Sequence, residues 1–264
     1  MDICEYNRKA WDHQVKSGNK WTVPVTEDTI QKAFNGDWQI VLTPTIPVPR
    51  DWFPPVKGAK VLCLASGGGQ QGPVLAAAGA CVATLDNSPS QLNQERLTAD
   101  NNGLEIQTIL RDMRNLEIFG DNTFDFIVHP VSNVFVPDVN AVWKESYRVL
   151  RDGGVLLSGF MNPSVFLFDW RLAENTGELR VKYPLPYSDE NDLEESEKQD
   201  KIKNGEPFDF SHTLNDQIGG QIKAGFVIDG FYEDRSSPED NDPLEPYMAT
   251  CIATRAVKMK VNGI

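Results

Sequence analysis

Long apolar stretches are absent from this chain of 264 residues. It contains no run of about 18 apolar residues, and its start does not show a basic segment followed by an apolar one. We therefore expect neither a membrane span nor an export signal, and no membrane as a partner. The hydrophobic content of 40% and the charged content of 24% are ordinary for a globular protein. The length suits one α/β domain with an insertion, or two small domains.

Cysteine is scarce, and positive charge is outnumbered. The four cysteines, Cys4, Cys63, Cys81 and Cys251, show no paired short spacing. Most of them fall in strand-like runs, where cysteine is usually a small buried residue, so we predict no metal site and a reducing, cytoplasmic location. The net charge of −13 and the pI near 4.7 argue against a nucleic acid as partner, because phosphate binding needs a basic face.

The glycines gather directly after an apolar run. The run at 61–64 predicts a buried strand, the glycines within 67–72 predict a tight turn, and the Ala-rich run that ends at Gly79 predicts a helix. A second apolar run, 81–85, predicts a strand that ends on Asp86, about 20 residues past the turn. This is the pattern of a nucleotide-binding βαβ unit, whose carboxylate accepts hydrogen bonds from ribose hydroxyls.

The alternation of strands and helices continues beyond Asp86. Ser88-Pro89 predicts a helix that ends near Asn102. The remaining pattern predicts strands at 105–110, 124–128 and 155–160, a helix capped by Asp138 and a turn at 151–154. Such alternation implies a parallel sheet with helices on both faces and ligands outside the carboxyl ends of the strands. Asp86, Asp112 and the segment 129–133 follow predicted strands and therefore converge on the glycine turn.

Two segments interrupt this core, which we expect at 57–160 and 212–264. Residues 1–56 form a leader with two predicted helices, 6–15 and 27–34, followed by prolines that keep the chain extended. Such a leader commonly covers the cofactor cleft, but its tryptophans are as well explained by packing on the core. The insertion at 161–211 holds aromatic residues that suit either a substrate pocket or a cover for the sheet. Its acidic run, 189–200, is predicted to be a solvated, mobile face.

The second core segment completes the predicted sheet. Thr213 and Asp216 are a plausible capping pair for a helix that carries Leu214, Ile218 and Ile222 at four-residue spacing and stops at Gly225. Two last strands, at 226–233 and 247–257, are predicted to form an antiparallel hairpin. The expected fold is therefore α/β: a Rossmann-like, seven-stranded, mostly parallel sheet with a terminal antiparallel hairpin and helices on both faces.

The glycine turn alone does not distinguish a dinucleotide site from an S-adenosylmethionine site. Gly67, Gly69 and Gly72 match the dinucleotide spacing only if shifted. A second mononucleotide-binding half is also missing, because the chain runs from the fifth predicted strand into the insertion. Both features disfavour an NAD-dependent oxidoreductase, and seven strands that end in a reversed pair favour an S-adenosylmethionine site.

Several strings resemble those of the class I S-adenosylmethionine-dependent methyltransferases. Residues 147–154 are similar to the Arg-Val-Leu-Lys-Pro-Gly-Gly helix–turn of the small-molecule methyltransferases related to ubiquinone and menaquinone biosynthesis. Residues 61–69, 84–86, 111–113 and 124–130 resemble, in that order, the first four motifs of the family. The strings 66–71 and 129–133 look like those of a bacterial subgroup. The resemblance implies S-adenosyl-L-methionine as cofactor, a small-molecule substrate and in-line transfer of the methyl group.

The resemblance also implies which residues bind the cofactor. Asp86 would meet the ribose, Asp112 the adenine amino group, and Met113 would flank the ring. The full expected set is Ala65, Ser66, Gly67, Gly69, Gln71, Asp86, Asn87, Gln91, Asp112, Met113, His129 and Ser132. A base is needed only if the acceptor arrives protonated, and His129 is the first candidate because it sits at a predicted strand tip. His212 and His13 are weaker candidates.

Two positions depart from the family pattern. Cys63 stands where an acidic residue is usual, and Ala65 where a glycine is usual. The missing carboxylate removes one polar contact near the methionine end of the cofactor, which Gln70, Gln71 or a leader residue would have to replace. A non-catalytic protein that binds S-adenosylmethionine or S-adenosylhomocysteine therefore remains an alternative. The sequence identifies neither the methyl acceptor nor an oligomeric state.

Overall fold

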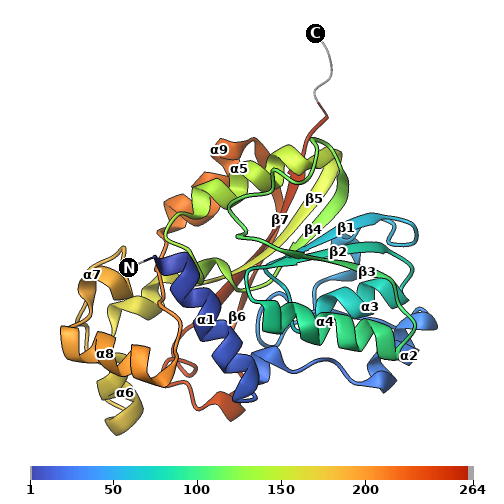
Figure 1. Cartoon of the computed structure of the whole chain (residues 1–264). Coiled ribbons are helices and arrows are strands. Elements are labelled where there is room, and N and C mark those ends of the chain that lie inside the picture. The colour runs from blue at the N-terminus through green and yellow to red at the C-terminus, as the bar shows by residue number, and fades with distance from the viewer. Residues whose placement is uncertain (1, 261–264) are drawn as a thin grey trace.

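The seven strands of the computed structural model, which describes residues 2–260, form one sheet in the order β3-β2-β1-β4-β5-β7-β6 (Figure 1). The first five strands are parallel, and β7 is antiparallel to both of its neighbours. The predicted fold class is thus confirmed. The strands are β1 Lys60–Leu64, β2 Cys81–Asp86, β3 Ile106–Leu110, β4 Phe124–His129, β5 Leu150–Met161, β6 Phe226–Asp234 and β7 Cys251–Lys258.

Successive side chains of the central strands enter two different hydrophobic clusters. Leu62 and Leu64 of β1 belong to one cluster, together with Trp143, while Val61 and Cys63 belong to the other. These four side chains are fully buried, whereas Lys60, the first residue of β1, is exposed. Because a strand directs alternate side chains to opposite faces, β1 needs an apolar residue at each of the four buried positions, and this explains its unbroken apolar run.

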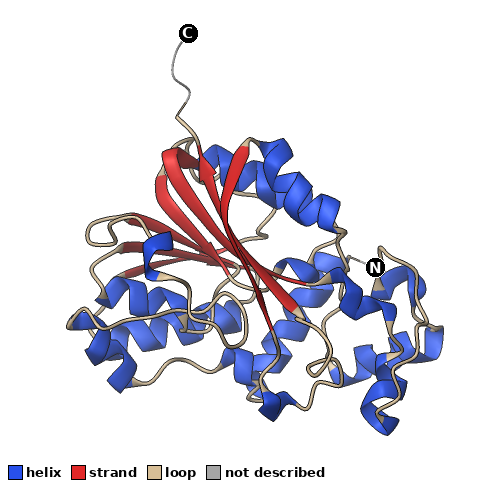
Figure 2. Cartoon of the chain, turned by 180° about the vertical axis from the view of Figure 1, so that it is seen from behind, coloured by secondary structure: helices blue, strands red, loops and turns tan. Residues whose placement is uncertain are grey.

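Helices cover both faces of the sheet, as Figures 1 and 2 show. Helices α5 and α9 lie on one face, and α2, α3 and α4 lie on the other. The α-helices are α1 Ile3–Lys16, α2 Glu27–Phe34, α3 Gln71–Ala77, α4 Pro89–Asn101, α5 Val139–Val149, α6 Trp170–Thr176, α7 Asp189–Asp192, α8 Glu195–Asn204 and α9 Gly220–Ala224. Within the described residues, no helix is both long and apolar enough to traverse a lipid bilayer.

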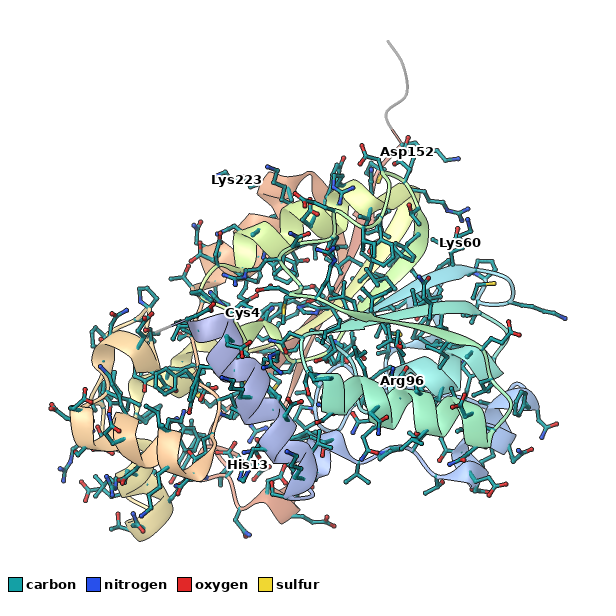
Figure 3. All side chains as sticks on the ribbon, in the orientation of Figure 1. Cys4, His13, Lys60, Arg96, Asp152 and Lys223 are labelled. Carbon is teal, nitrogen blue, oxygen red and sulfur yellow. The ribbon has the colours of Figure 1, made fainter. Side chains whose placement is uncertain are left out.

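The leader and the insertion meet beside the carboxyl ends of the strands. Cys4 and His13 lie at opposite ends of α1 (Figure 3). Asn7, between them, hydrogen-bonds through its side chain to the carbonyl oxygens of Phe135 and Phe208. Phe208 belongs to the insertion, and Phe135 follows β4, so α1 joins the insertion to the core. Its capping residue is Asp2, whose side chain accepts from the Glu5 N–H.

Three local expectations differ from the structure in whole or in part. The predicted turn at 151–154 lies inside β5, which starts at Leu150 and contains an irregularity in its pairing with β4. The acidic run forms α7 and part of α8, and its residues are exposed or half-buried as expected except for the first, Asp189, which is buried. In the last helical segment, Leu214 and Ile222 are exposed, and the buried residues are Gln217, Gly220 and Gln221. A π-helical turn at Asn215–Gly219 shifts the face that a regular four-residue spacing would bury.

Candidate active site

The glycine turn after β1 is held close to the second strand. A Cβ atom on Gly67 would lie 2.8 Å from the Gln91 Cβ and 3.0 Å from a carboxylate oxygen of Asp86, so only glycine fits there. Gly68 and Gly69 have φ angles of +101° and +78°, which also favour glycine. The turn thus brings its backbone N–H groups to the tip of β2.

Asp86 ends β2 and is buried. Its carboxylate accepts hydrogen bonds from the backbone N–H groups of Gly67 at 3.0 Å and Ser88 at 2.8 Å. Burial raises the pKa of Asp86 to about 6, and these hydrogen bonds oppose the rise. The carboxylate also lines a cavity. Its position is the one expected of a ribose ligand.

A second buried carboxylate, which sequence reasoning missed, lies behind the turn. Glu95 on α4 is fully buried and accepts hydrogen bonds from the Gly69 N–H and the Thr84 hydroxyl, each at 2.8 Å. Thr84 is the register partner of Cys63. Burial raises the pKa of Glu95 to about 7. The available signal was the helical spacing of Gln91 and Glu95, which places both on the inner face of α4.

One cavity of about 800 Å³ runs from the glycine turn to the insertion. Most of the expected cofactor residues line it: Ala65, Ser66, Gly67, Gln71, Asp86, Asn87, Gln91, Met113 and Ser132. Gly69 and Asp112 do not. The Gly69 N–H faces Glu95, and the Asp112 carboxylate is held by Arg114 and by the Cys4 thiol. The structure therefore brings most of the expected cofactor residues together around one cavity, and it does not bring Asp112 to the cavity wall.

His129 does not reach the cavity either. Its side chain is fully buried, its Nδ1 lies 2.9 Å from the Leu64 carbonyl oxygen, and its ring packs edge-on against Trp143. Burial lowers the pKa of His129 to about 4, so the ring is neutral at neutral pH. His212 is also buried and is bound through Nε2 to the Asn133 carbonyl oxygen at 3.0 Å. Neither position supports the role of a catalytic base.

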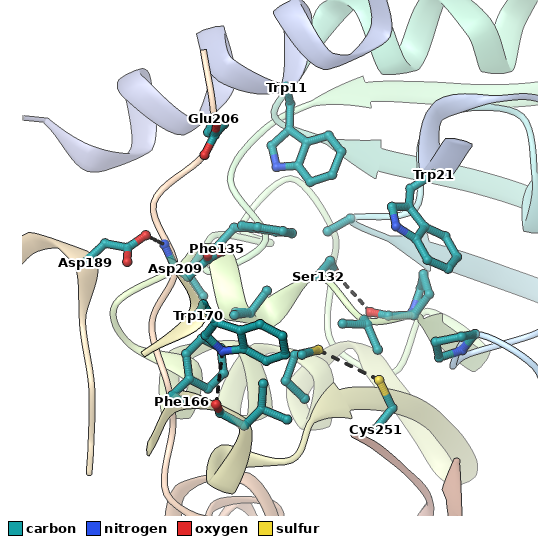
Figure 4. Close-up of a pocket in the computed structure, with 18 of the residues that line it drawn as sticks. Trp11, Trp21, Ser132, Phe135, Phe166, Trp170, Asp189, Glu206, Asp209 and Cys251 are labelled. Carbon is teal, nitrogen blue, oxygen red and sulfur yellow. Dashed lines mark hydrogen bonds between the residues drawn. The ribbon is translucent and has the colours of Figure 1, made fainter. Parts of the chain in front are cut away.

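The leader contacts the glycine turn directly. The Val25 N–H donates to the Gly69 carbonyl oxygen at 2.9 Å, and the Gln71 side chain donates to the Val41 carbonyl oxygen at 3.2 Å. Asp12 of α1 accepts hydrogen bonds from the Ser88 hydroxyl and the Ser90 N–H at the start of α4. Trp11 and Trp21 line the cavity (Figure 4). The leader is thus part of the wall of the site.

The insertion forms the opposite wall. Phe166 and Tyr187 stack with their ring centroids 5.7 Å apart, and Trp170 lies beside Phe166 (Figure 4). Lys201 of α8 pairs with Asp189 and Asp209, and Asp189 also accepts from the Tyr187 hydroxyl. The predicted pocket-lining role of the insertion aromatics is therefore the one that the structure favours.

Comparisons with known proteins agree with this geometry. The sequence model of a family described as "Methyltransferase domain" matches residues 62–158. The chain is 55% identical over 257 residues to the Bacillus subtilis (strain 168) protein YbaJ, described as an uncharacterized methyltransferase, and the match covers 97% of this chain and 99% of YbaJ. The chain belongs to the class I S-adenosylmethionine-dependent methyltransferase family.

Solved structures share the fold at low sequence identity. An S-adenosylmethionine-dependent methyltransferase from Mesorhizobium loti superposes with a TM-score of 0.60 at 18% identity, over 79% of this chain and 94% of that one. A putative S-adenosylmethionine-dependent methyltransferase from Listeria monocytogenes gives a TM-score of 0.58 at 19% identity, over 80% of this chain and 96% of that one. Within this family the chain is a methyltransferase, and S-adenosyl-L-methionine is its cofactor.

Proposed function

We propose that this methyltransferase transfers the methyl group of S-adenosylmethionine to a small molecule by in-line displacement. The observation that carries the proposal is a cavity lined at one end by Asp86 and the glycine turn and at the other by the insertion aromatics. Its volume of about 800 Å³ lies near the upper end of small-molecule sites, which span roughly 300–1,000 Å³. One cavity therefore offers adjoining places for the methyl donor and its acceptor.

The residues present fit the cofactor. Gln91 Oε1 is buried beside the glycine turn and has no hydrogen-bond partner among the described residues. A buried acceptor in this state costs free energy unless a ligand supplies the donor. Asp86 would hold the ribose hydroxyls, Gln91 would accept from a ligand donor, and Asn87 and Met113 would flank the adenine.

Methyl transfer from a sulfonium requires mainly that the protein align the acceptor atom with the methyl carbon. When bound, S-adenosylmethionine supplies an electrophilic methyl carbon on a sulfonium sulfur. The walls of the cavity position the acceptor atom in line with that carbon and exclude water, which is catalysis by orientation. Carboxylates on the insertion wall could accept a proton released by the acceptor. Among them is Asp209, whose pKa burial raises to about 6.

The alternative is a cofactor-binding protein without activity, which Cys63 and the absence of a clear base favour. The structure weakens the first reason, because the Glu95 carboxylate lies behind the same turn and binds the Gly69 N–H. The burial of His129 and His212 agrees with the second reason, and a turnover measurement distinguishes the two functions.

Two measurements test the proposed function. Calorimetry should detect binding of S-adenosylmethionine and S-adenosylhomocysteine but not of NAD. Incubation of the protein with methyl-labelled S-adenosylmethionine and a small-metabolite extract should then yield a labelled small molecule and S-adenosylhomocysteine. Absence of cofactor binding would refute the site, whereas binding without any labelled product from the extract would favour the non-catalytic alternative.

A further inference from the structure

The acceptor end of the cavity carries a distinctive charge pattern. Among the described residues that line it, the cationic side chains are Arg171 and Lys201. Both are already paired, Arg171 with Asp200 at 3.2 Å and Lys201 with Asp189 and Asp209. Lys182, outside the lining, pairs with Asp169 and Glu197. Carboxylates still outnumber all of these cations on the same wall: Asp169, Glu174, Asp189, Glu197, Asp200, Glu206 and Asp209. An anionic acceptor would find no free cation there, and the surplus of negative charge would repel it.

Two of these carboxylates lie beside aromatic rings. Trp11 of α1 and Phe135 make an edge-to-face pair, with their centroids 4.9 Å apart. Both rings, together with Glu206 and Asp209, line the main cavity and also a smaller adjoining pocket of about 280 Å³ (Figure 4). The Asp209 side chain is 30% exposed, and its contact with Lys201 engages only one carboxylate oxygen. Carboxylates next to aromatic faces are the surroundings in which an organic cation binds best.

The remainder of this wall is apolar. The stacked pair of Phe166 and Tyr187, with Val165 and Met161 beside it, offers hydrocarbon and ring surface to a ligand. Such a surface suits an apolar or aromatic body and gives affinity through buried area.

We propose that the acceptor site binds a hydrophobic amine, with its ammonium group at Asp209 and Glu206 beside the contacting Trp11 and Phe135 rings and its apolar body against Phe166 and Tyr187. This inference rests on the proposed function, because it describes the second ligand of the same cavity. It separates this methyltransferase from those that act on carboxylic acids or phosphate esters.

The test uses three probes that share one ring system and differ in the head group: 2-naphthylmethylamine, 2-naphthylmethanol and 2-naphthoate. Calorimetry on the full chain, saturated with S-adenosylhomocysteine at neutral pH, should show the amine binding at least about tenfold more tightly than the alcohol, with no detectable binding of the acid. Added salt should weaken binding of the amine and leave that of the alcohol unchanged. Equal affinity for amine and alcohol, or binding of the acid, would overturn the proposal.

Variants locate the head group. Asp209→Asn should weaken binding of the amine about tenfold and leave affinities for the alcohol and S-adenosylhomocysteine unchanged. Glu190→Gln, an exposed acid on the same insertion outside the cavity lining, is the matched control and should change nothing. Unchanged amine affinity in Asp209→Asn would overturn the assignment. If that variant does not fold, Glu206→Gln and the salt dependence decide the question. Failure of S-adenosylhomocysteine to bind would refute the proposed function instead, and amine binding is therefore also measured without it.

Discussion

The carboxylate of Glu95 accepts a hydrogen bond from the Gly69 N–H at 2.8 Å. Glu95 lies on α4, outside the segments that resemble family motifs. It also binds the hydroxyl of Thr84, the strand neighbour of Cys63. Cys63 stands where the family usually has an acidic residue. The chain thus carries a buried carboxylate beside that position, but on α4 rather than on β1. A group that orders the glycine turn should matter for cofactor binding even without touching the cofactor.

Replacement of Glu95 should weaken binding of S-adenosylmethionine. Glu95→Ala leaves the Gly69 N–H and the Thr84 hydroxyl without their partner, and each such loss costs about 1–3 kcal/mol when buried. Glu95→Gln keeps the shape and one acceptor, and should retain most of the affinity. Calorimetry on both variants checks this, with Asp100→Ala, an exposed residue at the end of the same helix, as control. Equal losses in Ala and Gln variants would contradict a role through hydrogen bonding.

An acidic residue can be restored by mutation at position 63, where the family usually has one. Cys63→Asp alone should destabilise the protein, because it buries a second carboxylate near Glu95. In a Glu95→Gln background Cys63→Asp should lower the free energy of unfolding by less, because the negative charge of Glu95 is absent. A double-mutant cycle on the free energy of unfolding measures this coupling. Additive effects would show that the two positions do not interact.

Glu95 also predicts a pH dependence of stability. Its pKa rises from 4.5 to about 7 on folding, because burial disfavours the charged form. Between these values the folded chain holds more protons than the unfolded chain, so the free energy of unfolding should fall as the pH rises, by at most about 1.4 kcal/mol per pH unit. Glu95→Gln removes this contribution, and the difference between the two denaturation profiles isolates it from that of Asp86. A constant difference across the range would contradict the shift.

Asp86→Ala should weaken binding of S-adenosylmethionine by more than about 1 kcal/mol, the loss expected for a charge-assisted hydrogen bond. Removal of the carboxylate also frees the Gly67 and Ser88 N–H groups, so stability is measured alongside by thermal unfolding. Asp86→Asn, which keeps one acceptor oxygen, should lose less of the affinity. Wild-type affinity in folded Asp86→Ala would refute the ribose assignment.

Local chemistry predicted those elements whose signals lie within a few residues. Ser88-Pro89 starts α4 as expected, and Glu27–Phe34 forms a helix with the predicted bounds. The expected end of β2 at Asp86 is also found, because an apolar run and the residue that follows it define a buried strand. The apolar pattern of β1 and β2 therefore sufficed to place the glycine turn and Asp86 at one end of the cavity.

The errors come from contacts between distant segments. Asp-Gly-Gly at 152–154 has the composition of a turn, but Leu150 and Val155 on either side pair with β4, so this unpaired stretch lies as an irregularity inside β5. The acidity of 189–200 predicted solvent exposure, but Lys201 and Tyr187 bind Asp189 and permit its burial. His129 lies at the tip of a strand as expected, as the last residue of β4, yet the Leu64 carbonyl and Trp143 hold its ring inside the core. Apart from Tyr187, which lies two residues before Asp189, these partners lie at least 12 residues away and are not identifiable from sequence proximity.

Gly72 offers a test in which helix propensity and packing predict opposite signs. It is the second residue of α3, and replacement of glycine by alanine normally stabilises a helix, by at most about 1 kcal/mol in a helix interior. A Cβ atom at Gly72 would, however, overlap the Glu95 Oε1 atom and approach the Thr84 hydroxyl to 3.0 Å. Gly72→Ala should therefore destabilise the protein, by about 1–3 kcal/mol in denaturant unfolding.

Two further variants decide whether the Glu95 contact is the cause. Gly120→Ala is the matched control, because its Cβ would meet only the Thr123 hydroxyl at 3.7 Å, and it should stay within about 0.5 kcal/mol of the parent. In a Glu95→Ala background the overlapping carboxylate is absent. The destabilisation by Gly72→Ala should therefore be smaller there, or become a stabilisation, because alanine has the higher helix propensity. If Gly72→Ala lowers the free energy of unfolding by as much in that background as in the parent, the clash is not with Glu95.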